Sequence, residues 1–202
     1  MIGLPRRIFL VGLALAPAAC SLLPQGGPPP KLYTLTPATG SPTGGSRVTW
    51  QLLVETPVSA GALDTDRIAL SRGPISLDYF AAAAWVDRAP LMLQTLIVQS
   101  FENSGRIAAV ARETLSLRAD YMLLPEVRHF EADYGAAAVP AAHVELGMKL
   151  IRMPERAIVA QQLFDARVPA AANDVPAIVD AFNAAFHQVA QQVVEWTLSA
   201  GR

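Results

Sequence analysis

Polar and apolar residues alternate most regularly between positions 143 and 152. Four apolar residues recur there at every second position with polar side chains between them: Val144, Leu146, Met148 and Leu150 against His143, Glu145 and Lys149. A period of two is typical of a strand with one buried face, because successive side chains point to opposite sides of a sheet. The pattern predicts a strand with the apolar set inward and the polar set outward. Residues 156–168 are its predicted hairpin partner across Met153-Pro154-Glu155.

Shorter apolar runs predict further strands earlier in the chain. Residues 48–55 alternate in the same way, and residues 66–73 and 75–80 form a second predicted hairpin around Arg72-Gly73-Pro74. Residues 84–87 extend the second strand of that hairpin. The remaining predicted strands cover residues 32–35, 107–112 and 121–134.

Two stretches show helical periodicity instead. In the first, Asp87 is the expected N-cap, Pro90 occupies the first turn, and Asn103-Ser104-Gly105 ends the helix. Its apolar residues recur at a spacing of three to four: Leu93, Leu96, Ile97 and Phe101. The second helix begins near Asn173 or Asp174 and carries one apolar stripe: Ile178, Val179, Phe182, Phe186, Val189, Val193 and Trp196. Each helix therefore has one face suited to a core.

The order of these elements predicts the fold class. Strands, a helix, more strands and a final helix are typical of an α+β domain. We expect a largely antiparallel sheet with two helices packed on one face. Residues 32–202 have the length of a single domain with its own core.

A charged and then apolar segment precedes this domain. Arg6 and Arg7 are followed by nine mostly apolar residues, 8–16, and by small residues directly before Cys20. This layout is typical of a secretory signal peptide, and the run is too short to cross a bilayer, which needs about 20 residues. Residues 1–19 are therefore the predicted signal peptide. Arg6 and Arg7 fit twin-arginine export as well as Sec export, and both routes leave the cytoplasm.

The only cysteine of the chain carries the prediction of a lipid anchor. The residues before Cys20 resemble a bacterial lipobox, although Pro17 stands where leucine is usual. The resemblance implies cleavage before Cys20, a diacylglycerol on its thiol and an N-acyl chain such as palmitate on its amino group. Residues 20–31 then form a proline- and glycine-rich lipidated tether that spans up to about 30 Å.

Composition limits the partners that the mature chain can have. The full chain holds 16 basic and 17 acidic residues, and removing residues 1–19 leaves a net charge of −3. The basic residues are scattered singly, so no nucleic-acid partner is expected. No second apolar run approaches membrane length, which leaves the lipid as the expected anchor.

Candidate catalytic and metal-binding residues are few. Asp64, Asp66 and Asp78 form the nearest approach to an acidic cluster, but the first two lie in a predicted turn, where aspartate bonds its own backbone. The three histidines, His129, His143 and His187, fall on two strands and a helix without metal-ligand spacing. We therefore expect solvated histidines, no metal, no catalytic residue and no cofactor beyond the acyl chains on Cys20.

The aromatic residues fall mostly on inward positions, which favours core packing over a ligand cage. They are Trp50, Tyr79, Phe80, Trp85, Phe182, Phe186 and Trp196. The pattern leaves both interpretations open for Trp85.

The whole pattern is similar to one known family, the ABC-type transport auxiliary lipoproteins, which include the paraquat-inducible C lipoprotein branch. The similarity covers most of residues 20–135. It depends on an order of features more than on a single motif: the lipobox, "LYTL", "WQLLVETP", then Arg67, Tyr79, Trp85, Pro90, "SGRIAAV" at 104–110 and "DYMLLPEVRHFEADY".

The resemblance implies a non-enzymatic lipoprotein that works with an MCE-type substrate-binding protein and an ABC permease and ATPase. Such systems move lipids or other apolar molecules across the envelope. Ser21, in place of the aspartate that retains many lipoproteins in the inner membrane, favours the periplasmic side of the outer membrane, with the inner membrane as the alternative. The second hypothesis is a lipoprotein that activates or scaffolds another envelope machine, and the third is a hydrolase. Self-association through the open sheet face is also compatible with the predicted fold.

Overall fold

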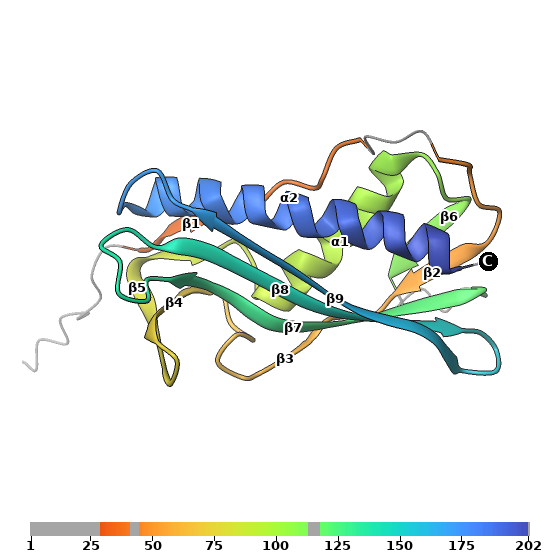
Figure 1. The fold of residues 1–202 in the computed structure, drawn as a ribbon, viewed down its shortest axis with the longest axis horizontal. Coiled ribbons are helices and arrows are strands. Elements are labelled where there is room, and N and C mark those ends of the chain that lie inside the picture. The colour runs from red at the N-terminus through yellow and green to blue at the C-terminus, as the bar shows by residue number, and fades with distance from the viewer. Residues whose placement is uncertain (1–28, 41–44, 113–117, 202) are drawn as a thin grey trace, which may run out of the picture.

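Nine strands and two helices make up the part of the chain that the computed structural model describes, residues 29–40, 45–112 and 118–201. Both helices lie on one side of a single sheet, and α1 crosses obliquely behind α2, which runs along the sheet (Figure 1). The elements are β1 (Lys31–Tyr33), β2 (Gln51–Val54), β3 (Val58–Ser59), β4 (Arg67–Gly73), β5 (Ser76–Trp85), α1 (Ala89–Ser104), β6 (Ala109–Arg112), β7 (Tyr121–Asp133), β8 (Ala141–Arg152), β9 (Ala157–Pro169) and α2 (Val175–Ala200). The predicted α+β class is confirmed.

The long strands form an antiparallel meander. β7 pairs with β8 from end to end, and β8 pairs with β9 in the same way. The four apolar residues predicted to point inward from β8 are at most 1% exposed, so the alternation and the hairpin across residues 153–155 are both confirmed. Val144 and Leu146 lie under α2, which packs against β8 and β9.

The short strands pair differently from the long ones. β2, β3 and β4 all lie beside β7 and run parallel to it, β6 runs parallel to β2, and β1 runs parallel to β5. The β4–β5 hairpin is antiparallel, as predicted. The sheet is therefore mostly but not wholly antiparallel. The parallel pairs arise because β2, β3 and β4 follow one another along β7 in its own direction, beside residues 121–123, 126–127 and 131–133.

The first helix begins one residue later than predicted. Its N-cap is Arg88, without a side-chain bond, whereas Asp87 uses its carboxylate to accept the amide of Arg88 at 2.7 Å. The predicted cap at Asp87 is thus wrong. Gly105 ends the helix with a φ of 63°, in the left-handed region where glycine has no side chain to strain.

The second helix carries the largest part of the core. Asp174 is its N-cap, and its side chain accepts the amide of Ala177 at 2.9 Å. The predicted apolar stripe is buried up to Val193. Phe182 packs against Trp85 and Phe130 with ring centroids 5.4 and 5.1 Å apart. Trp85 is only 1% exposed, so it belongs to the core and not to a ligand cage.

The predicted leader and most of the tether, including Cys20, lie outside the described residues. Signal cleavage and lipidation therefore stay predictions. Neither described helix combines the length and hydrophobicity that a membrane crossing requires.

Candidate functional site

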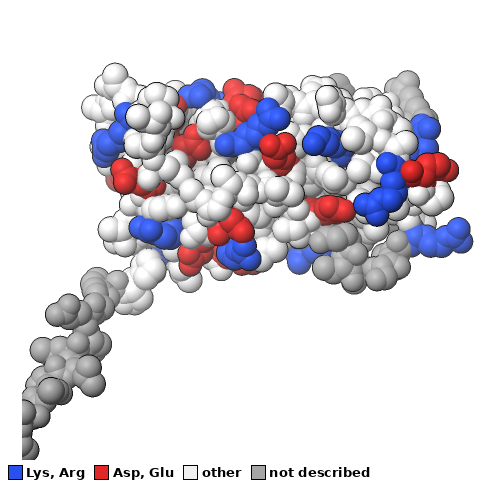
Figure 2. All heavy atoms as spheres, turned by 90° about the horizontal axis from the view of Figure 1, so that it is seen from below, with Lys and Arg blue, Asp and Glu red and all other residues white. Residues whose placement is uncertain are grey.

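The sheet presents one face that the helices do not cover. On β8 this open face carries His143, Glu145, Gly147 and Lys149, because these positions alternate with the buried apolar set. Seen from below the orientation of Figure 1, basic and acidic side chains are interspersed over the surface (Figure 2). Such a mixture does not produce the single-sign field that recruits a polyanion.

A groove of about 600 Å³ crosses the open face at the middle of β7, β8 and β9. Val58 and Leu163 border it and are 69% and 50% exposed. Gly147 is part of its lining, and a Cβ atom there would meet Leu163 at 3.4 Å and Arg128 at 3.5 Å. The absence of a side chain at residue 147 therefore keeps the groove open between two apolar walls.

A second groove, of about 680 Å³, lies between the β4–β5 hairpin and the ends of β7 and β8. Ile75, at the hairpin turn, is 99% exposed and borders it on one side. His129, Glu131 and His143 border it on the other side. The second groove therefore combines an apolar rim with ionisable groups.

His129, Glu131 and His143 of the second groove, together with the neighbouring Glu145 and Asp165, form a histidine–carboxylate cluster. Glu131 contacts both histidines, with its Oε1 2.7 Å from His129 Nδ1 and 3.4 Å from His143 Nδ1. Asp165 Oδ1 lies 2.6 Å from His143 Nε2. The two imidazole rings stack with centroids 4.1 Å apart.

The position of His143 corrects the sequence prediction. It was expected to point into solvent, but it is 2% exposed although it lies on the open face. The neighbouring strands β7 and β9 supply the groups that cover it, as Glu131 and Asp165 show. The sequence spacing of the histidines did not indicate a contact between them, but the β7–β8 pairing brings His129 and His143 together.

The cluster alters the acidity of its members. Burial alone lowers the pKa of His143, but the carboxylates of Glu131 and Asp165 beside its ring outweigh burial and raise that pKa above 6.5. Burial alone raises the pKa of Glu131, but the neighbouring imidazoles of His143 and His129 and the hydrogen bond from the amide of Phe130 leave it below 4.5. The charged forms of both groups are thereby favoured together.

An ion pair lies beside the cluster. Arg167 on β9 donates to Asp133 on β7, whose carboxylate also accepts the amide of Gly135 at 3.0 Å and the hydroxyl of Ser71 at 3.2 Å. Partial burial raises the pKa of Asp133, but these three bonds outweigh it and leave the pKa below 3.8. Asp133 therefore links β7 to β4 and β9 most strongly while it is ionised.

The stability contributed by Asp133 is expected to depend on pH. A folded-state pKa below the unfolded value means that the contribution is complete above pH 3.8 and is lost as the pH falls through the lower folded-state value. Asp133→Asn should cost about 1 kcal/mol at neutral pH, and this difference should shrink below pH 3.8. Urea unfolding at several pH values measures it. Asp78→Asn, at an exposed position on β5, is the matched control, and a pH-independent difference for Asp133→Asn would contradict the assignment.

The other candidate residues do not join this cluster. Asp64 lies in the predicted turn, where its amide bonds Ala60 O at 3.1 Å. Its carboxylate was expected to bond the local backbone, but it pairs with Arg88. Asp66 lies at the end of that turn, and Asp78 is exposed on β5 opposite Leu70.

His187 lies on α2, on the helix side of the sheet, and its Nε2 is 3.0 Å from both the hydroxyl and the carbonyl oxygen of Thr36. It is partly exposed, in agreement with the expected solvated histidine, and it also joins the segment after β1 to α2.

A family model for the ABC-type transport auxiliary lipoprotein component matches residues 33–194. The chain belongs to this family. The resemblance noted for residues 20–135 therefore extends through β8, β9 and most of α2. An uncharacterized protein of Bradyrhizobium diazoefficiens is 28% identical over 151 residues, which are 74% of this chain. The chain spans about 40% of the length of that relative.

Solved structures share the fold of this auxiliary lipoprotein. A Xanthomonas campestris protein of the DUF330 family is 37% identical, with a TM-score of 0.80 over 85% of this chain and 96% of its own. A second, uncharacterized protein is 12% identical with a TM-score of 0.66 over 84% of this chain and 99% of its own, which shows a common fold alone.

Proposed function

We propose that this chain is a non-catalytic periplasmic lipoprotein component of an ABC/MCE-type system that moves lipids or other apolar molecules across the envelope. Membership of the transport auxiliary family is the observation that carries the proposal. The first groove supports it, because it is a wide surface feature bordered by apolar side chains and not an enclosed cavity.

The lipid anchor explains how modest contacts can support a working complex. A domain held by the tether of residues 20–31 stays within about 30 Å of its membrane attachment. Its effective concentration near a partner in the same envelope is then high, so weak intrinsic affinity is sufficient. We place the anchor in the outer membrane, facing the periplasm, with the inner membrane as the alternative.

The partner surface that fits this role is the β9 edge together with the first groove. Among the described strands, β9 pairs only with β8, so one side of its 13 residues presents main-chain groups to an added strand. Leu163 projects from β9 at the rim of the groove, and Val58 lies on its other side. An extended segment of an MCE-type protein could bond to the edge and place apolar side chains in the groove.

Photo-crosslinking in intact cells tests this surface. A photoreactive residue at Leu163 should recover an MCE-type protein. The same residue at Gln188, exposed on α2 on the opposite side of the sheet, should not. The full lipidated chain is used, and each product is identified by mass spectrometry.

The two other outcomes separate the alternatives. Recovery of cell-wall synthases or assembly machinery without any MCE-type protein would favour the activator or scaffold hypothesis. Recovery of an MCE-type protein from Gln188 and not from Leu163 would keep the transport role but move the interface to α2.

A further inference from the structure

Each histidine of the histidine–carboxylate cluster has one ring nitrogen held by a carboxylate. His143 Nε2 is 2.6 Å from Asp165 Oδ1, and His129 Nδ1 is 2.7 Å from Glu131 Oε1. A histidine that binds a metal usually donates its other N–H to a carboxylate in this way, which fixes the tautomer and directs the free lone pair. The cluster contains this arrangement twice.

The remaining nitrogen of His143 has no hydrogen-bond partner. Its Nδ1 is buried, and the side chain is 2% exposed. Glu131 Oε1 is the nearest charged oxygen at 3.4 Å, but that oxygen is already held closely by His129. A buried nitrogen left in this state costs free energy unless something binds it.

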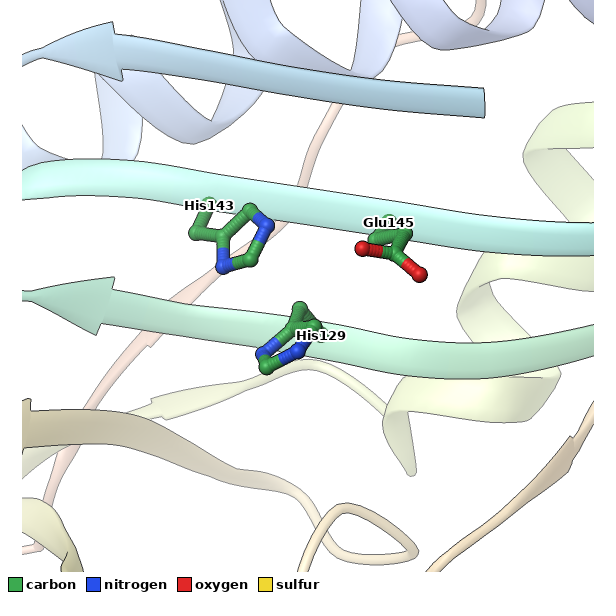
Figure 3. A group of neighbouring side chains, drawn as sticks. All are labelled: His129, His143 and Glu145. Atoms are coloured by element: carbon green, nitrogen blue, oxygen red, sulfur yellow. The ribbon is translucent and has the colours of Figure 1, made fainter. Parts of the chain in front are cut away.

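A third ligand faces the two histidines. Glu145 lies directly across from His129 in the β7–β8 pairing, and one ligand atom from each of His129, His143 and Glu145 lies within 4.8 Å of the others (Figure 3). Nitrogens bound to Zn²⁺ at about 2.0–2.1 Å lie roughly 3.3 Å apart in a tetrahedron. Closure of the site requires the His129 ring to turn out of its stack with His143, because the lone pairs of stacked rings lie in nearly parallel planes. The side chain of His129 is 46% exposed, which leaves room for this turn.

We propose that His129, His143 and Glu145 form a binding site for Zn²⁺, with Glu131 and Asp165 as the carboxylates that orient the two histidines. Two imidazoles and one carboxylate are a ligand set that suits Zn²⁺ among the divalent ions. The second groove gives the ion access from solvent, since His129, Glu131 and His143 line it.

The charges around the site match a cation. Carboxylates outnumber arginines on this part of the open face, and Arg167 is already paired with Asp133. The nearest competing cation is Arg128, which is 3.9 Å from Glu145 and 3.6 Å from Glu126. Arg128 can therefore give up its ion pair with Glu145, which then binds the ion, and retain its ion pair with Glu126. The groups on this part of the face are Glu126, Glu131, Asp133, Glu145 and Asp165 against Arg128, Lys149 and Arg167.

Titration of the full chain with ZnCl₂ tests the proposal. The protein is purified in detergent without a histidine tag, stripped with a chelator and studied by calorimetry. One equivalent of Zn²⁺ should bind, and His129→Ala or Glu145→Gln should weaken binding at least tenfold. Asp165→Asn should weaken binding about 10–100-fold without removing a ligand. His187→Ala, which removes a histidine outside the cluster, should leave binding unchanged.

A second readout separates ligation from a structural role. Co²⁺ in place of Zn²⁺ should give the visible absorption of a tetrahedral site in the wild type but not in His129→Ala. Because His129 is half-exposed, its replacement should not unfold the protein, so the lost absorption would report a lost ligand. Absence of binding at millimolar ZnCl₂ would overturn the proposal. Stoichiometric binding that is unchanged in His129→Ala and Glu145→Gln would also overturn it, because the ion would then lie elsewhere.

Discussion

Replacing Cys20 with serine is expected to abolish membrane attachment. A serine hydroxyl does not accept the diacylglycerol, so the leader is not removed by the lipoprotein route and no acyl chains are added. Each buried CH₂ of an acyl chain contributes about 0.8 kcal/mol to membrane binding, so loss of all the chains should shift the protein fully out of the detergent phase. Detergent partitioning and intact mass spectrometry measure the change.

Pro17→Leu is the matched control for this change. It restores the leucine that is usual three positions before the lipidated cysteine, and it should leave the mature mass and detergent partitioning unaltered. A wild-type protein that is uncleaved, or that begins at a residue other than Cys20, would contradict the lipobox interpretation.

Phe182→Ala should cause the largest loss of stability of the changes considered. Phe182 is fully buried and joins α2 to the sheet through its ring contacts with Trp85 and Phe130. Removing a buried phenylalanine ring typically costs about 3–5 kcal/mol, because the cavity that remains is only partly filled. Urea unfolding of the soluble body, residues 31–202, measures the loss.

Ile75→Ala supplies the control for Phe182→Ala. Ile75 is a large apolar residue at the turn of the β4–β5 hairpin, but it is 99% exposed. Its removal should change the free energy of unfolding by no more than about 0.5 kcal/mol. Equal effects of the two changes would show that α2 does not pack on the sheet in solution as described.

Local patterns accounted for most of the secondary structure. The alternation on β8 and the stripe on α2 identified their buried residues, because each pattern depends only on the geometry of one strand or one helix. The α+β class followed from the order of the elements. The parallel pairing of β2, β3 and β4 with β7 did not, because it joins segments distant in sequence whose relative direction no local pattern encodes.

The sequence by itself determined the core strands, the two helices, the family resemblance and the prediction of lipid attachment at Cys20. Only the tertiary structure decided the histidine–carboxylate cluster. A register shift in the β7–β8 pairing between Val127 and His129 changes which side chains point inward. Phe130 therefore enters the core, while His129 and Glu131 turn to the open face beside His143. A β-bulge adds one residue to one strand and so reverses the alternation of its side chains beyond that point. The periodicity of one strand does not show where the bulge lies, because the pairing with the neighbouring strand determines its position.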